Sequence, residues 1–256
     1  MMKSRRSYPE SLTMKVELFH YEKILKEDFF SVNVLYRADS GNRYVLKISD
    51  FRFILGFLLR PLAFLMSRRE YKIYSMVADL PNIPELGSRF GLRGYFHKFI
   101  EGKTLHELDR DERRNLPDDF FDRLRTTIEE IHRRRIFYLD LNKQGNIILG
   151  DDGMPYLIDF QVSIHFKYRN RLFDKLFNLF IPEDIYHLYK HKRRFRPDLM
   201  TDDEMRLSER SELGKLINRY YGDPYRRIKR KIYPSGSNEI IWYKWKKMKD
   251  KSKRMS

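Results

Sequence analysis

Short runs of β-forming residues and turn signals dominate the first hundred positions of the chain. Such runs cover Glu22–Glu27, Val32–Arg37 and Arg43–Ile48. The last two are separated by Asp39-Ser-Gly-Asn42, a strong hairpin-turn signal. Prolines and glycines then punctuate two more short strands, which end at Tyr95–Ile100. The pattern predicts a small antiparallel sheet.

Helical periodicity appears once inside this strand-rich part and over most of the chain after Leu105. Pro61 is expected to break or start the first helical region. One strand-rich interruption, Gly145–Ile164, divides the later helices. The predicted helical segments are Leu55–Leu80, Leu116–Arg135, Phe173–Lys190 and Thr201–Tyr221.

These patterns predict an α+β chain of two lobes. The N-lobe, residues 1–100, holds the sheet and a helical region at Phe53–Leu80. The larger C-lobe, residues 101–224, is mainly helical and follows a connector at Glu101-Gly102. Residues 225–256 form a separate basic tail.

The most apolar stretch, Phe53–Met66, is about fourteen residues long and contains Arg60 and Pro61, whereas a membrane span needs about 20 apolar residues. We expect it to cover the small lobe as a buried helix. The alternative is that it exposes apolar side chains to a bilayer surface. Those side chains are Phe57, Leu58, Leu62 and Leu65.

Composition excludes several classes of protein. The absence of cysteine excludes a disulfide framework, cysteine-ligated zinc, iron–sulfur clusters and thiol catalysis. Met1–Ser7 is basic, but no apolar run follows it, so no secretory signal is expected. We expect a cytoplasmic protein that is soluble or peripheral at the inner membrane.

The formal net charge of +16 indicates an anionic partner. The tail, residues 225–256, holds twelve Lys or Arg against two acidic residues, together with Trp242 and Trp245. A basic amphipathic helix with tryptophan is typical of contact with an anionic membrane surface. The alternative is a solvated helix whose aromatic stripe packs on the protein. Only the high pI favours nucleic acid, and the sequence contains no recognisable nucleic-acid module.

The strand-rich interruption carries the candidate chemistry. Asp140 is followed by Asn146, an apolar strand and then Asp159-Phe-Gln161. Phosphoryl transfer needs one carboxylate to orient a hydroxyl and accept its proton, and an asparagine and second carboxylate to hold Mg²⁺ against nucleotide phosphates. A hairpin closed by Asp151-Asp-Gly153 would place Asn146 and Asp159 at neighbouring strand ends.

With these residues in this order, the sequence resembles the protein-kinase-like superfamily. The resemblance implies a two-lobed kinase-like fold. Asp140 resembles the catalytic-loop aspartate, Asn146 the Mg²⁺-binding asparagine, and Asp159-Phe-Gln161 the DFG segment. The closest resemblance is to bacterial lipopolysaccharide core (Kdo and heptose) kinases, with RIO-type kinases next. The compact catalytic loop without His-Arg, the Phe-Ile-Glu-Gly hinge and Asp-Phe-Gln in place of Asp-Phe-Gly carry this resemblance.

The resemblance also implies roles outside this segment. Tyr44-Val-Leu-Lys47 resembles the strand that ends in the phosphate-pairing lysine, and Glu70 is expected to pair with that lysine. The segment Lys98–Leu105 resembles the interlobe hinge, which implies that the backbone of Lys98 and Ile100 holds adenine. The expected cofactors are ATP and Mg²⁺.

Two departures from the family pattern stand out. No G-x-G-x-x-G motif occupies the expected place, where the chain has Lys26–Ser31. The spacing from Asp140 to Asn146 is one residue longer than the family pattern. A one-residue bulge at Gly145 is expected to absorb this difference, and Asn142 is the alternative ligand.

A basic run, Tyr189–Pro197, follows the DFG-like segment at the distance where kinase-fold enzymes build the acceptor site. We hypothesise that it recognises a phosphorylated or carboxylated acceptor, as anionic inner-core sugars are. The alternative is a solvated run of charge. The residues concerned are Lys190, Lys192, Arg193, Arg194 and Arg196.

The sequence therefore predicts a Mg·ATP-dependent kinase that transfers the γ-phosphate to an acceptor hydroxyl. The favoured acceptor is an anionic glycolipid, with the hydroxyl on a sugar of the lipopolysaccharide inner core. Two alternatives stay open. One is an atypical, RIO-like kinase with a protein serine or threonine as acceptor. The other is a pseudokinase or membrane-associated scaffold, which the missing glycine-rich loop favours.

Overall fold

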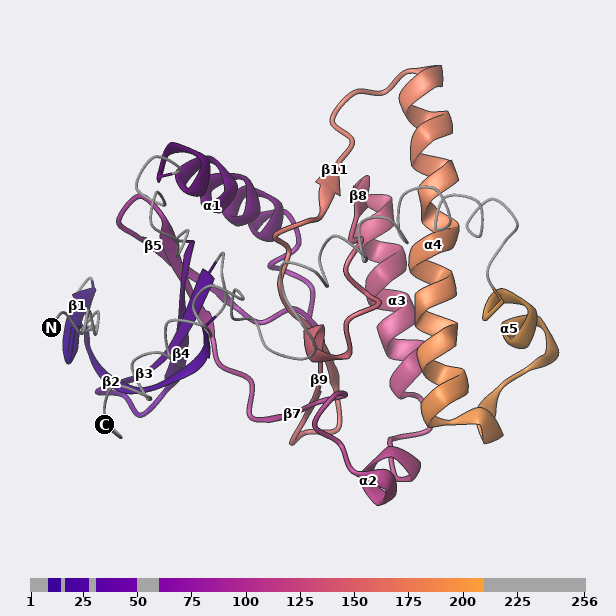
Figure 1. The fold of residues 1–256 in the computed structure, drawn as a ribbon, viewed down its shortest axis with the longest axis horizontal. Helices are drawn as coiled ribbons and strands as arrows, with labels where there is room; N and C mark the ends of the chain where they lie inside the picture. Colours follow the sequence, from indigo (N-terminus) through magenta and orange to yellow (C-terminus); the bar gives the residue numbers. More distant parts are fainter. Residues whose placement is uncertain (1–8, 15–16, 28–30, 50–59, 210–256) are drawn as a thin grey trace, which may run out of the picture.

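The computed structural model describes residues 9–14, 17–27, 31–49 and 60–209. Figure 1 shows a sheet-rich N-lobe beside a larger C-lobe of helices and short strands. The predicted basic tail and the first part of the apolar stretch, residues 53–59, lie outside the described residues, as does the end of the last predicted helix.

A six-stranded antiparallel sheet forms the N-lobe, in the order β1-β2-β3-β4-β6-β5. The strands predicted from the sequence are all present, and the turn at Asp39–Asn42 joins β3 to β4 as expected. The bounds are β1 Ser11–Met14, β2 Glu17–Glu27, β3 Ser31–Ala38, β4 Arg43–Ser49, β5 Leu86–Phe90 and β6 Gly94–Lys98.

Alternation along the strands gives the sheet two different faces. Val34, Leu46 and Phe96 belong to a small apolar core on the outer face. The side chains at intervening positions, among them Val45 and Lys47, point to the opposite face, toward α1 and the C-lobe. The lysine that the sequence singled out therefore faces the junction of the lobes.

Helix α1, Arg60–Ser75, packs beside β4 and β6, with Pro61 in its first turn as a helix start. Its buried side includes Ala63, Glu70 and Tyr74, at helical spacing. The predicted burial of Leu62 and Leu65 is wrong, because both lie on the other side of the helix and are 45% and 58% exposed.

The C-lobe is built around two helices that lie side by side, α3 and α4 (Figure 1). The predicted strand-rich interruption contains β9 and β10, an antiparallel hairpin closed by the turn at Asp151–Gly153. The helices are α2 Arg110–Arg114, α3 Phe120–Arg133, α4 Arg171–Phe195 and α5 Asp202–Leu207. The strands are β7 Gly102–Thr104, β8 Ile136–Phe137, β9 Ile147–Gly150, β10 Pro155–Leu157 and β11 Ile164–His165.

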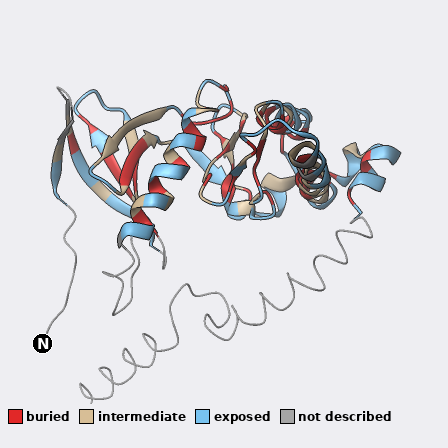
Figure 2. Ribbon diagram, turned by 90° about the horizontal axis from the view of Figure 1, so that it is seen from above, coloured by how far each residue is buried: buried red, intermediate tan, exposed pale blue. Residues whose placement is uncertain are grey.

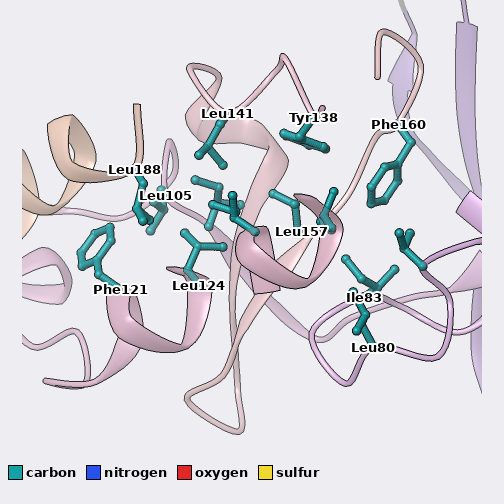
Figure 3. Close-up of a cluster of buried hydrophobic side chains, with 14 of the residues drawn as sticks. Leu80, Ile83, Leu105, Phe121, Leu124, Tyr138, Leu141, Leu157, Phe160 and Leu188 are labelled. Carbon is teal, nitrogen blue, oxygen red and sulfur yellow. The ribbon is translucent and has the colours of Figure 1, made fainter. Parts of the chain in front are cut away.

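One apolar core runs through the C-lobe and into the base of the N-lobe (Figure 3). Helix α3 contributes Phe121, Leu124 and Ile128 from its buried side, while Asp122, Arg123 and Arg125 are exposed. Figure 2 shows buried segments, in red, in both lobes between exposed stretches in pale blue. The Tyr74 ring of α1 lies 5.2 Å, centroid to centroid, from the Phe160 ring of the C-lobe. Packing therefore fixes α1 against the segment that follows β10.

Among the described helices, none combines the length and the apolar character that a membrane crossing requires.

Candidate active site

Lys47 lies at the centre of a buried ion-pair network between the lobes. Strand alternation places it there, because Leu46 and Ile48 belong to the outer face of the sheet. Its Nζ atom is 2.6 Å from Glu70 Oε1 and 2.8 Å from Asp159 Oδ1. One ammonium group is thus shared by a carboxylate from α1 and a carboxylate from the C-lobe.

Glu70 is fully buried and its position is fixed from several sides. The Tyr95 hydroxyl donates to Glu70 Oε1 at 2.9 Å. The neighbouring Arg69 guanidinium donates to the carbonyls of Gln161, at 3.2 Å, and Ser163. Helix α1 is therefore bonded directly to the segment that follows Asp159.

The pKa values in this network follow from burial and charge. Burial alone would lower the pKa of the Lys47 ammonium, but Asp159 and Glu70 raise it above its ordinary value. Burial opposes ionisation of Asp159, yet the nearby cations, Lys47 foremost, bring its pKa below the ordinary range. Burial raises the pKa of Glu70, against the pull of Lys47. With both carboxylates ionised, Lys47, Glu70 and Asp159 together carry a net charge of −1.

A second polar cluster surrounds Asp140. Lys143 Nζ lies 2.6 Å from Asp140 Oδ2, and Asn146 Nδ2 donates to the same oxygen at 2.9 Å. Burial raises the pKa of Asp140, and the Lys143 ammonium partly offsets this. Lys143 is not among the site residues predicted from the sequence, although its place three residues after Asp140 was a signal for it.

A 3₁₀ turn absorbs the extra residue between Asp140 and Asn146. Lys143 N donates to the Asp140 carbonyl at 3.1 Å, and Asn146 N donates to the Lys143 carbonyl at 3.0 Å. These consecutive turns end in the 3₁₀ segment Gln144–Asn146. Ile158 N then donates to the Asn146 carbonyl at 3.0 Å, so the ends of the hairpin lie together as the spacing predicted.

Asp159 and Phe160 are held in a constrained turn. Asp159 has φ 69°, a left-handed conformation that is uncommon for a residue other than glycine. Its Oδ1 accepts from Gln161 N at 3.3 Å, and the Phe160 ring is buried between Tyr74 and Tyr138. Such strain persists only where the surroundings fix the residue, and here it aims the Asp159 carboxylate at Lys47.

Helix α4 supports the backbone around Asp140. Asp184 is buried, and its carboxylate accepts hydrogen bonds from Tyr138 N, Leu139 N and His132 Nε2 at 3.0, 3.1 and 3.0 Å. Two turns further along α4, His191 Nε2 bonds to the Leu141 carbonyl at 2.8 Å. None of these supports was identified from the sequence, because only the fold brings α4 beside this loop.

The hinge-like segment lines a hollow of about 570 Å³. Lys98, Phe99 and Ile100 form one wall, and the hollow contains none of the ion-paired residues described above. The Lys98 amide already donates to the Glu85 carbonyl at 2.8 Å, so a nucleobase could bond to Lys98 through its carbonyl group only.

The five basic residues predicted to bind the acceptor do not form one surface. Lys192 and Arg196 are buried; Lys192 bonds to Glu204 at 2.7 Å and Arg196 to Asp118 at 2.7 Å. Lys190 Nζ donates to Asn142 Oδ1 at 3.0 Å, beside the Asp140 loop. The exposed members are Arg193 and Arg194.

Comparison with known proteins tests the fold. No protein-family model matches the sequence, and no curated protein matches it either. The structure is similar to that of a Rio2 kinase from Chaetomium thermophilum, solved as an ADP/Mg²⁺-phosphoaspartate complex. The TM-score is 0.52 at 12% identity, and the match covers 82% of this chain and 69% of the Rio2 chain. The chain has a two-lobed protein-kinase-like fold.

The kinase-like fold confirms the predicted fold class. The polar clusters around Lys47 and around Asp140 both belong to this fold. Lys47 and Glu70 come from the N-lobe, while Asp140, Asn146 and Asp159 come from the C-lobe. Within the described residues no group of three or more His, Cys, Asp or Glu could hold a metal ion by itself.

Proposed function

We propose that the protein is a Mg·ATP-dependent phosphotransferase with an alcohol group as acceptor. The observation that carries this proposal is the Lys47 ammonium shared between Glu70 and Asp159, with the Asp140–Asn146 cluster at the same open end of the β9–β10 hairpin as Asp159. Lys47 would bond the α- and β-phosphates, with Glu70 holding it in place. The Lys98 carbonyl and the Ile100 backbone would hold adenine.

The residues present fit Mg²⁺ bound together with a nucleotide. Asn146 and Asp159 offer an amide and a carboxylate oxygen, the ligand type that Mg²⁺ prefers. Mg²⁺ usually takes one or two protein carboxylates and completes its shell with phosphate oxygens and water. When bound, it neutralises charge on the phosphates during transfer.

Asp140 would orient the acceptor hydroxyl and accept its proton. Burial raises its pKa, which brings the carboxylate closer to the working range of a general base. Asn146 and Lys143 donate to the same carboxylate oxygen and fix its direction. Lys143 is also placed to balance negative charge near Asp140 as the phosphoryl group arrives.

For the acceptor, we propose an anionic inner-core sugar of lipopolysaccharide, on the basis of the sequence resemblance. The exposed Arg193 and Arg194 would bind its acidic groups, and the basic tail would contact the anionic membrane surface from the cytoplasmic side. A protein serine or threonine is the second candidate acceptor, and the similarity to a Rio2 kinase favours it. Incubation of the protein with labelled ATP and either core glycolipid or general protein substrates separates the two candidates.

Asp159→Asn is expected to abolish the Mg²⁺-dependent part of ATP binding. The substitution removes the only carboxylate proposed to touch the metal and one of the two that hold Lys47. The measurement is the shift in melting temperature on adding ATP with and without Mg²⁺. The wild type should show a larger shift with Mg²⁺ and the variant should not. Equal Mg²⁺-dependent shifts in both proteins would contradict the metal-binding role.

Charge reversal at Arg193 and Arg194 is expected to raise the KM for the acceptor and to leave the KM for ATP unchanged. Both side chains are exposed on the last turn of α4, so the substitution should leave the fold intact. Arg206 of α5, whose side chain is 82% exposed, provides the control: Arg206→Glu should alter neither KM. Equal changes in both KM values would exclude a role in acceptor recognition.

A further inference from the structure

The hairpin of β2 and β3 covers the place where kinase-like enzymes hold the nucleotide phosphates, yet no glycine-rich motif is present in it. Glycine allows a loop backbone to approach phosphates closely. With Lys26–Ser31 in that place, the phosphates need a different set of donors, and side chains of the flanking strands are the nearest source.

Strand register places three polar side chains in a row on the face that carries Lys47. Lys26 of β2 pairs with Asn33 of β3, and Asn33 pairs with Lys47 of β4. Residues opposite one another in antiparallel strands point to the same side. At about 4.8 Å per strand, the row spans about 10 Å, which suits a chain of phosphate groups.

Asn33 has an unused polar group in this row. Its Oδ1 atom is buried and has no hydrogen-bond partner among the described residues. A buried polar atom without a partner is costly, and such atoms need an explanation. A half turn of the amide exchanges its oxygen and nitrogen, so the same position can present N–H donors to a phosphate oxygen.

Lys26 brings a positive charge to the same row. Its register position opposite Asn33 places its side chain on the face where Lys47 contacts Asp159. A cation on this face would attract the negatively charged phosphates.

We propose that Lys26 and Asn33 bind the phosphate chain of the nucleotide in place of a glycine-rich loop. This inference rests on the proposed function and extends it to residues that the family pattern does not supply. The ligand class is a nucleoside di- or triphosphate. Lys26 contributes a charge-assisted hydrogen bond, and Asn33 contributes a neutral one next to Lys47.

The test is calorimetric titration of the full chain, in the presence of Mg²⁺, with ATP, ADP and adenosine. Lys26→Met is expected to weaken ATP and ADP binding about tenfold or more, and Asn33→Leu about fivefold. Adenosine affinity should change in neither variant, because adenosine has no phosphate. Lys26→Arg should retain most of the ATP affinity, since it keeps the charge.

Lys23→Met is the matched control. Lys23 lies on the same strand and face as Lys26 but pairs with Leu35, away from Lys47. The Lys23→Met variant should bind ATP as the wild type does. If Lys23→Met and Lys26→Met lose ATP affinity equally, or if Lys26→Met also loses adenosine, the phosphate role is wrong.

Different results would contradict this inference and the proposed function. A wild-type protein that binds ATP, with Lys26→Met and Asn33→Leu unchanged, would overturn the phosphate role alone. A wild-type protein that binds no nucleotide in the presence of Mg²⁺ would overturn both.

Discussion

Asp140→Asn is expected to lower the rate of phosphoryl transfer about a thousandfold, while Mg·ATP affinity stays close to that of the wild type. The amide has nearly the same shape as the carboxylate but cannot accept the proton of an acceptor hydroxyl. Single-turnover transfer and nucleotide titration, measured on the same preparation, separate the two quantities. Asp203→Asn, at an exposed carboxylate of α5, is the control and should transfer normally.

The pH dependence of this reaction gives a second measure of Asp140. Because burial raises its pKa, the rate should increase with pH over a range above that of an ordinary aspartate, as the carboxylate loses its proton. This rising limb should be absent from the residual activity of Asp140→Asn. A variant that keeps both the wild-type rate and the rising limb would show that another group accepts the proton.

Asp184→Ala is expected to lower the free energy of unfolding by about 3 kcal/mol or more and to abolish transfer. The substitution leaves the amides of Tyr138 and Leu139 and the ring of His132 without their buried acceptor. Urea titration measures the stability. The neighbouring Glu183→Ala, at a partly exposed position of the same helix, should change the free energy by less than about 1 kcal/mol.

Transfer by Asp184→Ala must be measured below its unfolding transition, where the protein is still folded. Asp184 touches no reacting group in our proposal, so its effect on rate should come from misplacement of Asp140. A folded variant with normal kcat and normal pH dependence would mean that the Asp140 loop holds its position without α4.

The sequence allowed prediction of the strands and of the residues that meet around Lys47, for a physical reason. Strand alternation fixes which side Lys47 faces, and the order of Asp140, Asn146 and Asp159 along one hairpin fixes their proximity. Both features depend on residues that lie close together in the sequence, so the sequence pattern contains them. Asp184 lies 44 residues after Asp140 on a helix with ordinary periodicity, so its contact with the loop depended on the tertiary packing of α4.

The basic run on α4 shows that charge along the sequence does not by itself predict which residues are exposed. Lys192 and Arg196 lie four residues apart on the buried side of the chain, whereas Arg193 and Arg194 lie on the exposed side. Charge alone treats all of them as surface residues, although helical periodicity separates them. Their carboxylate partners, the buried Glu204 and the exposed Asp118 among them, come from elements that only the fold brings beside α4.

The bonds from Arg69 to the carbonyls of Gln161 and Ser163 have a consequence for inhibitor design. Compounds that require Phe160 to leave its pocket would have to break these bonds and unstack Phe160 from Tyr74 and Tyr138. Compounds that bind while Phe160 stays in its pocket need no such rearrangement. Screening libraries against this protein should therefore yield ligands that bind while Phe160 stays packed between Tyr74 and Tyr138.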